Sequence, residues 1–255
     1  MLIVALGLIA AALGWNTTPE SRELPGIHGE MIIASRRGDL ANYPENTIEG
    51  VLSAAAQDAP GIEIDVRASA EGTFFLMHDE TVDRTTSGSG AVAMMSDAEM
   101  ETLRIEDDLH VPRLTSVLDA LEAYPGVLLI DAKGGTAEHA VLAQLIVSRG
   151  IADRVWIGCY SAESVLAVEL IDLALATYGP AGTGADAELL ASPLPLGSRF
   201  ADISITAVPE SHTGDESDMI HEATQAGVDI FITNSLRAAL ADGEAYPLRA
   251  GTSLM

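Results

Sequence analysis

The feature that most constrains the fold is a repeated alternation of short apolar runs and helical patterns that begins at Met31. Strand-then-helix units repeated along a chain are typical of a parallel sheet covered by helices. The apolar runs predict eight strands, at residues 31–34, 62–66, 73–77, 127–131, 154–159, 174–178, 201–208 and 229–233. Eight parallel strands predict an α/β fold, a single (β/α)₈ TIM barrel whose site lies at the C-terminal strand ends.

Local signals mark the boundaries of several connections between these strands. Thr47 predicts the start of a helix, and Pro60-Gly61 predicts its end. Ser96 followed by Glu99 predicts a capping box at the start of a short helix. Residues 179–200 are rich in Gly, Pro and Ala with weak periodicity, and they predict an irregular excursion.

The first 29 residues differ from the rest of the chain. Residues 1–15 are apolar and carry no charged side chain, but the run is shorter than the roughly 20 residues that a membrane span needs. They predict an export signal or an N-terminal anchor, and hence a periplasmic or extracellular location. A buried terminal helix or a misassigned start codon is the alternative, with a cytoplasmic location. Residues 16–29 predict a linker, and residues 30–245 a single barrel domain.

The chain is strongly acidic, with 13 basic against 38 acidic residues and a net charge of −25. Such a surface repels nucleic acid and anionic lipid headgroups, so we expect no nucleic-acid partner and no membrane contact beyond an N-terminal anchor. It also repels small anionic substrates at long range. A site for an anionic substrate in this chain therefore requires a bound divalent cation and local arginine and lysine side chains.

Two carboxylates lie close together in Ile62-Glu63-Ile64-Asp65. At this spacing on a strand, Glu63 and Asp65 project from the same face, while the isoleucines project from the other. Adjacent anions on an inward face repel each other unless a positive charge lies between them, and a hard divalent cation with oxygen ligands is the usual solution. The alternative is an edge strand with a solvated acidic face.

The motifs around these carboxylates resemble the glycerophosphodiester phosphodiesterase family. The matching segments, in order, are Arg37-Gly38, Pro44-Glu45-Asn46-Thr47, Glu63-Ile64-Asp65, His78-Asp79 and Asp83-Arg84-Thr85-Thr86. Downstream, residues 129–134 and 227–234 resemble two further strands of the family. The resemblance runs from Met31 to Leu240 and weakens after Tyr160. It implies a barrel that hydrolyses a phosphodiester with the help of a metal ion.

The resemblance also implies roles for individual residues. It implies that Glu63, Asp65 and Asp131 bind a divalent cation, Mg²⁺ or Ca²⁺. Arg37 and Lys133 would bind the substrate phosphate, and His78 would transfer a proton. Glu45 would lie at the edge of the site, as a ligand or as an organiser of the first loop. Each role has a plainer alternative. The carboxylates would then form a structural acidic cluster, His78 would be a loop histidine held by its neighbour, and Lys133 would form an ordinary ion pair with Asp131.

Arg36 stands where the family carries its first catalytic histidine, immediately before Arg-Gly. A guanidinium with a pKa above about 12 cannot take over proton transfer. One hypothesis is that Arg36 abolishes the two-histidine mechanism and leaves a catalytically inactive barrel that binds phosphodiesters or has a structural role. The other is that Arg36 is catalytic and stabilises negative charge on the phosphoryl group, while a cation activates water and His78 protonates the leaving alkoxide.

Two smaller departures from the family pattern concern geometry. Asp131 stands in place of a glutamate, which shortens the reach of the carboxylate by one methylene, and Asn234 stands in place of an aspartate. The substrate implied by the resemblance is a glycerophosphodiester from lipid breakdown. A hydrolase that acts on another class of substrate is the remaining alternative.

Overall fold

The computed structural model describes residues 31–172, 175–178, 188–190, 204–209, 212, 215–226, 228 and 230–245. The expected export signal or anchor at residues 1–15 and the expected linker at residues 16–29 lie outside the described residues. Among the helices that are described, none combines the length and the apolar character that crossing a membrane requires.

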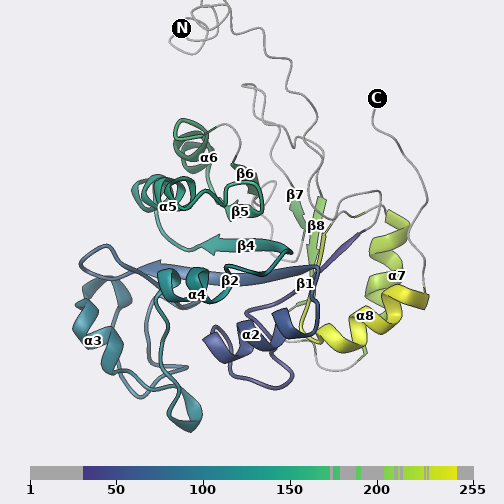
Figure 1. Ribbon diagram of the computed structural model, residues 1–255, viewed down its shortest axis with the longest axis horizontal. Helices are drawn as coiled ribbons and strands as arrows, with labels where there is room; N and C mark the ends of the chain where they lie inside the picture. The colour runs from purple at the N-terminus through teal and green to yellow at the C-terminus, as the bar shows by residue number, and fades with distance from the viewer. Residues whose placement is uncertain are drawn as a thin grey trace, which may run out of the picture.

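The strands form one curled sheet of the predicted α/β barrel class (Figure 1). They are β1 (Ile32–Ser35), β2 (Gly61–Ala68), β3 (Phe74–Leu76), β4 (Val127–Ala132), β5 (Val155–Gly158), β6 (Ala176–Tyr178), β7 (Glu188–Leu190), β8 (Ser204–Ala207) and β9 (Ile230–Thr233). The order across the sheet is β6-β5-β4-β2-β1-β9-β8-β7, with β3 attached to β2. The neighbours from β6 through to β8 run parallel. Their C-terminal ends therefore meet at one rim of the sheet.

Helices flank the strands in Figure 1, and two of them begin at the caps that the sequence predicts. They are α2 (Ile48–Ala56), α3 (Asp97–Thr102), α4 (Leu114–Ala120), α5 (Thr136–Ser148), α6 (Ala162–Glu169), α7 (Ser217–Ala226) and α8 (Leu236–Ala245), with 3₁₀ turns at Val92–Met94 and Glu106–Asp108. Thr47 caps α2, because its hydroxyl accepts a hydrogen bond from the backbone N–H of Gly50. Ser96 and Glu99 form both bonds of the predicted capping box at α3.

Two sequence-based predictions about the strands are wrong. The predicted third strand is β3, and it runs antiparallel to β2, with Val66 opposite Leu76. The short connection between them explains this, because a parallel pair needs a crossover of a dozen or more residues, whereas a short loop allows only a hairpin. The predicted irregular excursion at residues 179–200 contains β7, which pairs antiparallel with β8.

Alternation along the strands separates two apolar cores. The outer core joins strand residues such as Ile33, Ile64 and Ile130 to the helices. The inner core contains strand residues that project the other way, such as Ala34 and Leu129, and it fills the inside of the curled sheet. Glu63, Asp65 and Asp131 alternate with outer-core residues, so the pleat directs all three toward the inside, above the inner core.

A small lobe lies between β3 and α4 and has its own apolar core. Its buried residues are Phe75, Met77, Val82, Val92, Met100, Leu103, Ile105 and Val111. The lobe includes α3, which lies at the opposite end of the sheet from α7 and α8 (Figure 1). The lobe fixes the loop that follows β3, which carries His78, Asp79 and Arg84.

Candidate active site

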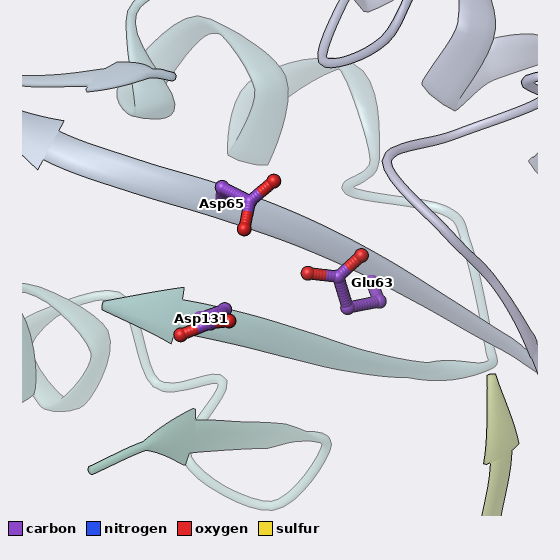
Figure 2. Close-up of side chains that lie close together, drawn as sticks. All are labelled: Glu63, Asp65 and Asp131. Carbon is purple, nitrogen blue, oxygen red and sulfur yellow. The ribbon is translucent and has the colours of Figure 1, made fainter. Parts of the chain in front are cut away.

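Three carboxylates from two neighbouring strands converge at the rim of the sheet (Figure 2). Glu63 and Asp65 come from β2 and Asp131 from β4, with Asp65 directly opposite Asp131. One oxygen from each lies within 4.8 Å of the others, and all three side chains are buried. The alternative of a solvated acidic strand is therefore wrong. Clustered carboxylate oxygens are the ligands of hard divalent cations, so this buried triad fits such an ion.

Two cationic side chains partly balance the triad. Arg37 Nε lies 2.9 Å from Asp65 Oδ2. Lys133 Nζ lies 3.1 Å from Asp65 Oδ1 and 2.5 Å from Asp131 Oδ2. The backbone N–H of Arg37 donates to Glu63 Oε2 at 2.9 Å, and a left-handed φ of 49° at Arg37 accompanies this bond. The loop after β1 therefore contributes a side chain to one carboxylate and a backbone donor to another.

The three carboxylates do not share this positive charge equally. Burial raises the pKa of Glu63 to about 8, and the nearby charges of Asp65 and Asp131 act in the same direction. Burial also favours a higher pKa at Asp65, but Lys133 and Arg37 outweigh it and hold that pKa below the ordinary value. Burial opposes the charge of Lys133, yet Asp131 and Asp65 raise the pKa of its ammonium group. Without a cation, Glu63 therefore retains its proton at neutral pH.

Two residues that the sequence analysis gave no role contact the triad directly. The Asn46 amide donates to Asp65 Oδ2 at 2.8 Å and accepts from the backbone N–H of Asp65 at 3.1 Å. The Tyr160 hydroxyl lies 2.5 Å from both oxygens of Asp131, and Lys133 Nζ lies 5.6 Å from the centre of its ring. Tyr160 follows β5 closely, at the rim where barrel sites form, and that position is the signal that could have identified it.

His78 is held from two sides at the end of β3. Its ring Nδ1 lies 2.7 Å from Asp79 Oδ1. Its backbone oxygen accepts from Arg67 Nε at 2.8 Å, and Arg67 also donates to the backbone oxygen of Lys133 at 3.3 Å. Arg67 thus ties the His78 segment to the end of β4, where Asp131 and Lys133 lie.

Glu45 lies between two arginines. Its Oε2 accepts from Arg37 Nη1 at 3.3 Å, and both of its oxygens accept from Arg84, at 2.8 and 2.7 Å. In the described part of the chain these contacts connect Glu45 to Arg37 rather than to the triad itself. Glu45 therefore reaches the carboxylates through the guanidinium of Arg37.

β1 lies between β2, which carries Glu63 and Asp65, and β9. Arg36 follows β1 directly, and its side chain contacts residues on the β9 side of β1. Its Nη1 donates to the backbone oxygen of Val208 and to Asn234 Oδ1, the latter at 3.3 Å. Its backbone N–H donates to Thr233 at 2.9 Å. The described contacts of Arg36 are thus with the ends of β8 and β9. They join Arg36 to Asn234 across the ends of β1 and β9.

Known proteins are similar to part of this chain. The model of the Glycerophosphoryl diester phosphodiesterase family matches residues 37–138. Glycerophosphodiester phosphodiesterase 1 of Rattus norvegicus is 34% identical over 154 residues, which cover 56% of this chain and 45% of the relative. The glycerophosphodiester phosphodiesterase of Caldanaerobacter subterraneus subsp. tengcongensis is 43% identical over 74 residues, or 29% of this chain and 30% of the relative. The chain thus spans less than half the length of these relatives.

Solved structures match most of the chain. The crystal structure of glycerophosphodiester phosphodiesterase from Agrobacterium tumefaciens has a TM-score of 0.65 and 26% identity, and covers 83% of this chain and 99% of its own. The Oleispira antarctica phosphodiesterase in complex with the product sn-glycerol-3-phosphate has a TM-score of 0.66 and 15% identity, with coverages of 84% and 96%, and shows the shared fold. The chain is therefore similar to glycerophosphodiester phosphodiesterases over residues 37–138 and in its fold, and its buried acidic triad fits that similarity.

Proposed function

We propose that this chain hydrolyses glycerophosphodiesters with a divalent cation, Mg²⁺ or Ca²⁺, at Glu63, Asp65 and Asp131. The observation that carries the proposal is the buried convergence of these three carboxylates beside two cationic side chains. When bound, the cation would supply Lewis-acid stabilisation of charge on the phosphoryl oxygens. The solved relative with bound sn-glycerol-3-phosphate supports a glycerol phosphate product.

Arg37 and Lys133 are the proposed phosphate ligands. Both lie against Asp65, so their positive charges are concentrated at the triad in a chain whose net charge is −25. Lys133 is 16% exposed in its side chain, and Arg37 is 7% exposed. Charges in such a water-poor setting stabilise a phosphoryl anion more strongly than exposed charges do.

His78 is the proposed proton donor to the leaving alkoxide. Water attacks phosphorus and releases one proton to solvent, and the bond from phosphorus to the alcohol oxygen breaks. That oxygen takes a proton from the imidazolium form of His78 and leaves as an alcohol, and His78 regains its proton from solvent. The contact of Nδ1 with Asp79 orients the ring and assigns this transfer to Nε2. The products are then an alcohol and a phosphomonoester.

Arg36 separates this proposal from a second candidate function. The guanidinium cannot transfer a proton, and the loss of one acid or base group slows a reaction about 10²–10⁴-fold. If Arg36 stabilises phosphoryl charge instead, the enzyme retains turnover. The bonds of Arg36 to Val208 and Asn234 favour the other possibility, in which Arg36 holds strand ends together and the barrel binds a phosphodiester without hydrolysing it.

The test is turnover of glycerophosphodiesters by chelator-treated protein after Mg²⁺ or Ca²⁺ is restored, with Arg36→His measured alongside. The proposed hydrolysis predicts cation-dependent product release by the wild-type protein, loss of that release in Asp65→Asn, and a lower rate in Arg36→His. The binding-module candidate predicts no wild-type turnover and the appearance of turnover in Arg36→His. Wild-type turnover that is independent of cations would contradict the assigned metal role.

A further inference from the structure

Arg84 belongs to the Asp83-Arg84-Thr85-Thr86 motif, which has no role in the proposed chemistry. Its guanidinium bridges two carboxylates in a forked arrangement. Toward Asp79, Nε donates at 2.6 Å and Nη2 at 3.0 Å. Toward Glu45, Nη1 donates at 2.8 Å and Nη2 at 2.7 Å. Bidentate pairs of this kind fix direction as well as distance, which a lysine ammonium cannot do.

Each of the two carboxylates is also bound to a proposed site residue. Asp79 Oδ1 lies 2.7 Å from His78 Nδ1. Glu45 Oε2 lies 3.3 Å from Arg37 Nη1, and Arg37 in turn contacts Asp65. Arg84 is therefore the middle link of an alternating chain of charges that runs from the imidazole to the acidic triad.

The bridge constrains the protonation of the histidine ring. The hydrogen bonds from Arg84 hold the pKa of Asp79 well below its usual range, so this carboxylate can only accept hydrogen bonds. A neutral imidazole facing such an acceptor must carry its proton on Nδ1. Nε2 is then the nitrogen that takes up a second proton and, from the resulting imidazolium, donates it to the leaving alkoxide.

The same bridge adds little to folding. The Arg84 side chain is 50% exposed, and ion pairs exposed to water contribute little to stability because solvent screens them. Asp79 and Glu45 are less exposed, at 27% and 17%. Removing Arg84 should therefore change where these two carboxylates point more than it changes whether the chain folds.

We propose that Arg84 is a positioning residue, which orients Asp79 so that His78 keeps its proton on Nδ1 and at the same time holds Glu45 against Arg37. This inference rests on the proposed function, because it assumes that His78 transfers a proton. Arg84 would act by fixing the orientation of the His78 imidazole. It does not need to contact the substrate.

The first test is the tautomer of His78, read by long-range ¹H–¹⁵N NMR at alkaline pH, with the signals assigned through His78→Gln. The wild-type protein should show the Nδ1-protonated form, and Arg84→Ala should show a mixture of the two tautomers. Arg84→Lys should lie between them, since it restores the charge without the fork. A pure Nδ1-protonated ring in Arg84→Ala would overturn the proposal.

The second test is kinetic. Arg84→Ala should lower kcat about 10–100-fold, as loss of an outer partner of a functional side chain does, and should change KM for the diester less, since Glu45 keeps its own bond to Arg37. Added guanidinium ion should restore part of kcat, because the half-exposed side chain leaves a site open to solvent. Loss of activity that follows the fraction of unfolded protein, without rescue, would overturn the proposal.

Arg113 provides the matched control within the same lobe. It also bridges two carboxylates, Asp97 at 2.9 Å and Glu101 at 2.8 Å, but its described contacts do not include His78 or Asp79. Arg113→Ala should leave the His78 tautomer unchanged and show no guanidinium rescue.

The tautomer and the activity test different claims. If Arg84→Ala changes the His78 tautomer but the wild-type protein is inactive, the proposed hydrolysis is contradicted, while the positioning of His78 by Arg84 is supported.

Discussion

Burial and the neighbouring carboxylates of Asp65 and Asp131 disfavour the negative charge of the Glu63 carboxylate. Its pKa rises from 4.5 to about 8, so the folded metal-free protein keeps a proton that the unfolded chain has released. Stability from this group is fully present below pH 4.5, and it is lost as the pH rises through about 8, at no more than about 1.4 kcal/mol per pH unit. A cation that requires the ionised carboxylate releases this proton on binding.

Glu63→Gln should remove that pH dependence, because glutamine imitates the protonated acid and can still accept from the Arg37 backbone. We would measure urea denaturation in the presence of a metal chelator at pH 5.5 and at pH 8, both within the interval from 4.5 to about 8. The free energy of unfolding of the variant, relative to that of the wild-type protein, should rise between these two pH values. The exposed Glu71→Gln is the control and should show no such gain. Parallel stability curves for Glu63→Gln and the wild type would contradict the assigned burial effect.

Tyr160 would compete with a cation bound at Asp131. Its hydroxyl lies 2.5 Å from both carboxylate oxygens, so it occupies lone pairs that a cation at Asp131 would use. Tyr160→Phe should therefore raise the affinity for Ca²⁺ about tenfold in calorimetric titration, the value of one hydrogen bond to a charged group. Tyr43→Phe, on an exposed ring, is the control. Weaker Ca²⁺ binding by Tyr160→Phe would instead show that the phenol supports the cation.

The sequence allowed prediction of the triad but not of its polar neighbours. The period of two placed Glu63 and Asp65 on one face, and the barrel placed Asp131 at the same rim. Asn46 and Tyr160 could not be assigned roles in this way, because their contacts depend on side-chain directions across 19 and 29 residues of chain. No local periodicity encodes such directions.

At the scale of elements, the loop between β1 and α2 is shaped by close contact of two backbones. Gly38 has a φ of +86°, and an added Cβ would lie 2.7 Å from the Gly50 carbonyl carbon and 2.8 Å from the Val51 nitrogen. The same loop carries Arg37 and Asn46 to the triad. A shift of α2 away from Gly38 would therefore also displace partners of the carboxylates.

Gly38→Ala should destabilise the fold by several kcal/mol more than Gly72→Ala, as measured by urea denaturation. Gly72 is the matched control, since its φ is +82° but no atom lies within 4 Å of the added Cβ. Gly72→Ala should therefore show only the backbone cost of a left-handed alanine, about 1–2 kcal/mol. Equal losses in the two variants would contradict the steric account of Gly38.

Element type was easier to predict than strand direction. The caps at Thr47 and Ser96 are local chemistry, and both predictions are confirmed. The direction of β3 was predicted wrongly because an apolar run looks the same in a parallel and an antiparallel strand. The length of the connection from β2 contained the missing information, since it is too short for a crossover.

At the scale of the whole molecule, the barrel class follows from the repeated strand and helix units and is confirmed by the curled sheet. The order β6-β5-β4-β2-β1-β9-β8 places consecutive parallel strands side by side, as such units dictate. The lobe after β3 could not be predicted as a unit, because its core forms between residues from Phe75 to Val111 that show no regular spacing.

The net charge of −25 should also affect substrate capture. Raising ionic strength from about 0.01 M to about 0.15 M shortens the Debye length from about 30 Å to about 8 Å and so screens the repulsion of an anionic diester. The value of kcat/KM for an anionic glycerophosphodiester should then rise several-fold. A glycerophosphodiester with no net charge is the control and should change little. A fall for the anionic substrate would indicate net attraction by the site.

The most direct test of the account is anomalous diffraction from crystals of this protein soaked with Mn²⁺, which stands in for Mg²⁺ or Ca²⁺. One strong anomalous peak is expected among the oxygens of Glu63, Asp65 and Asp131, at about 2.0–2.6 Å from each coordinating oxygen. A site in Asp65→Asn crystals should be weaker under the same soak. An anomalous map without a peak among these three carboxylates, or with its only strong peak elsewhere, would contradict the account.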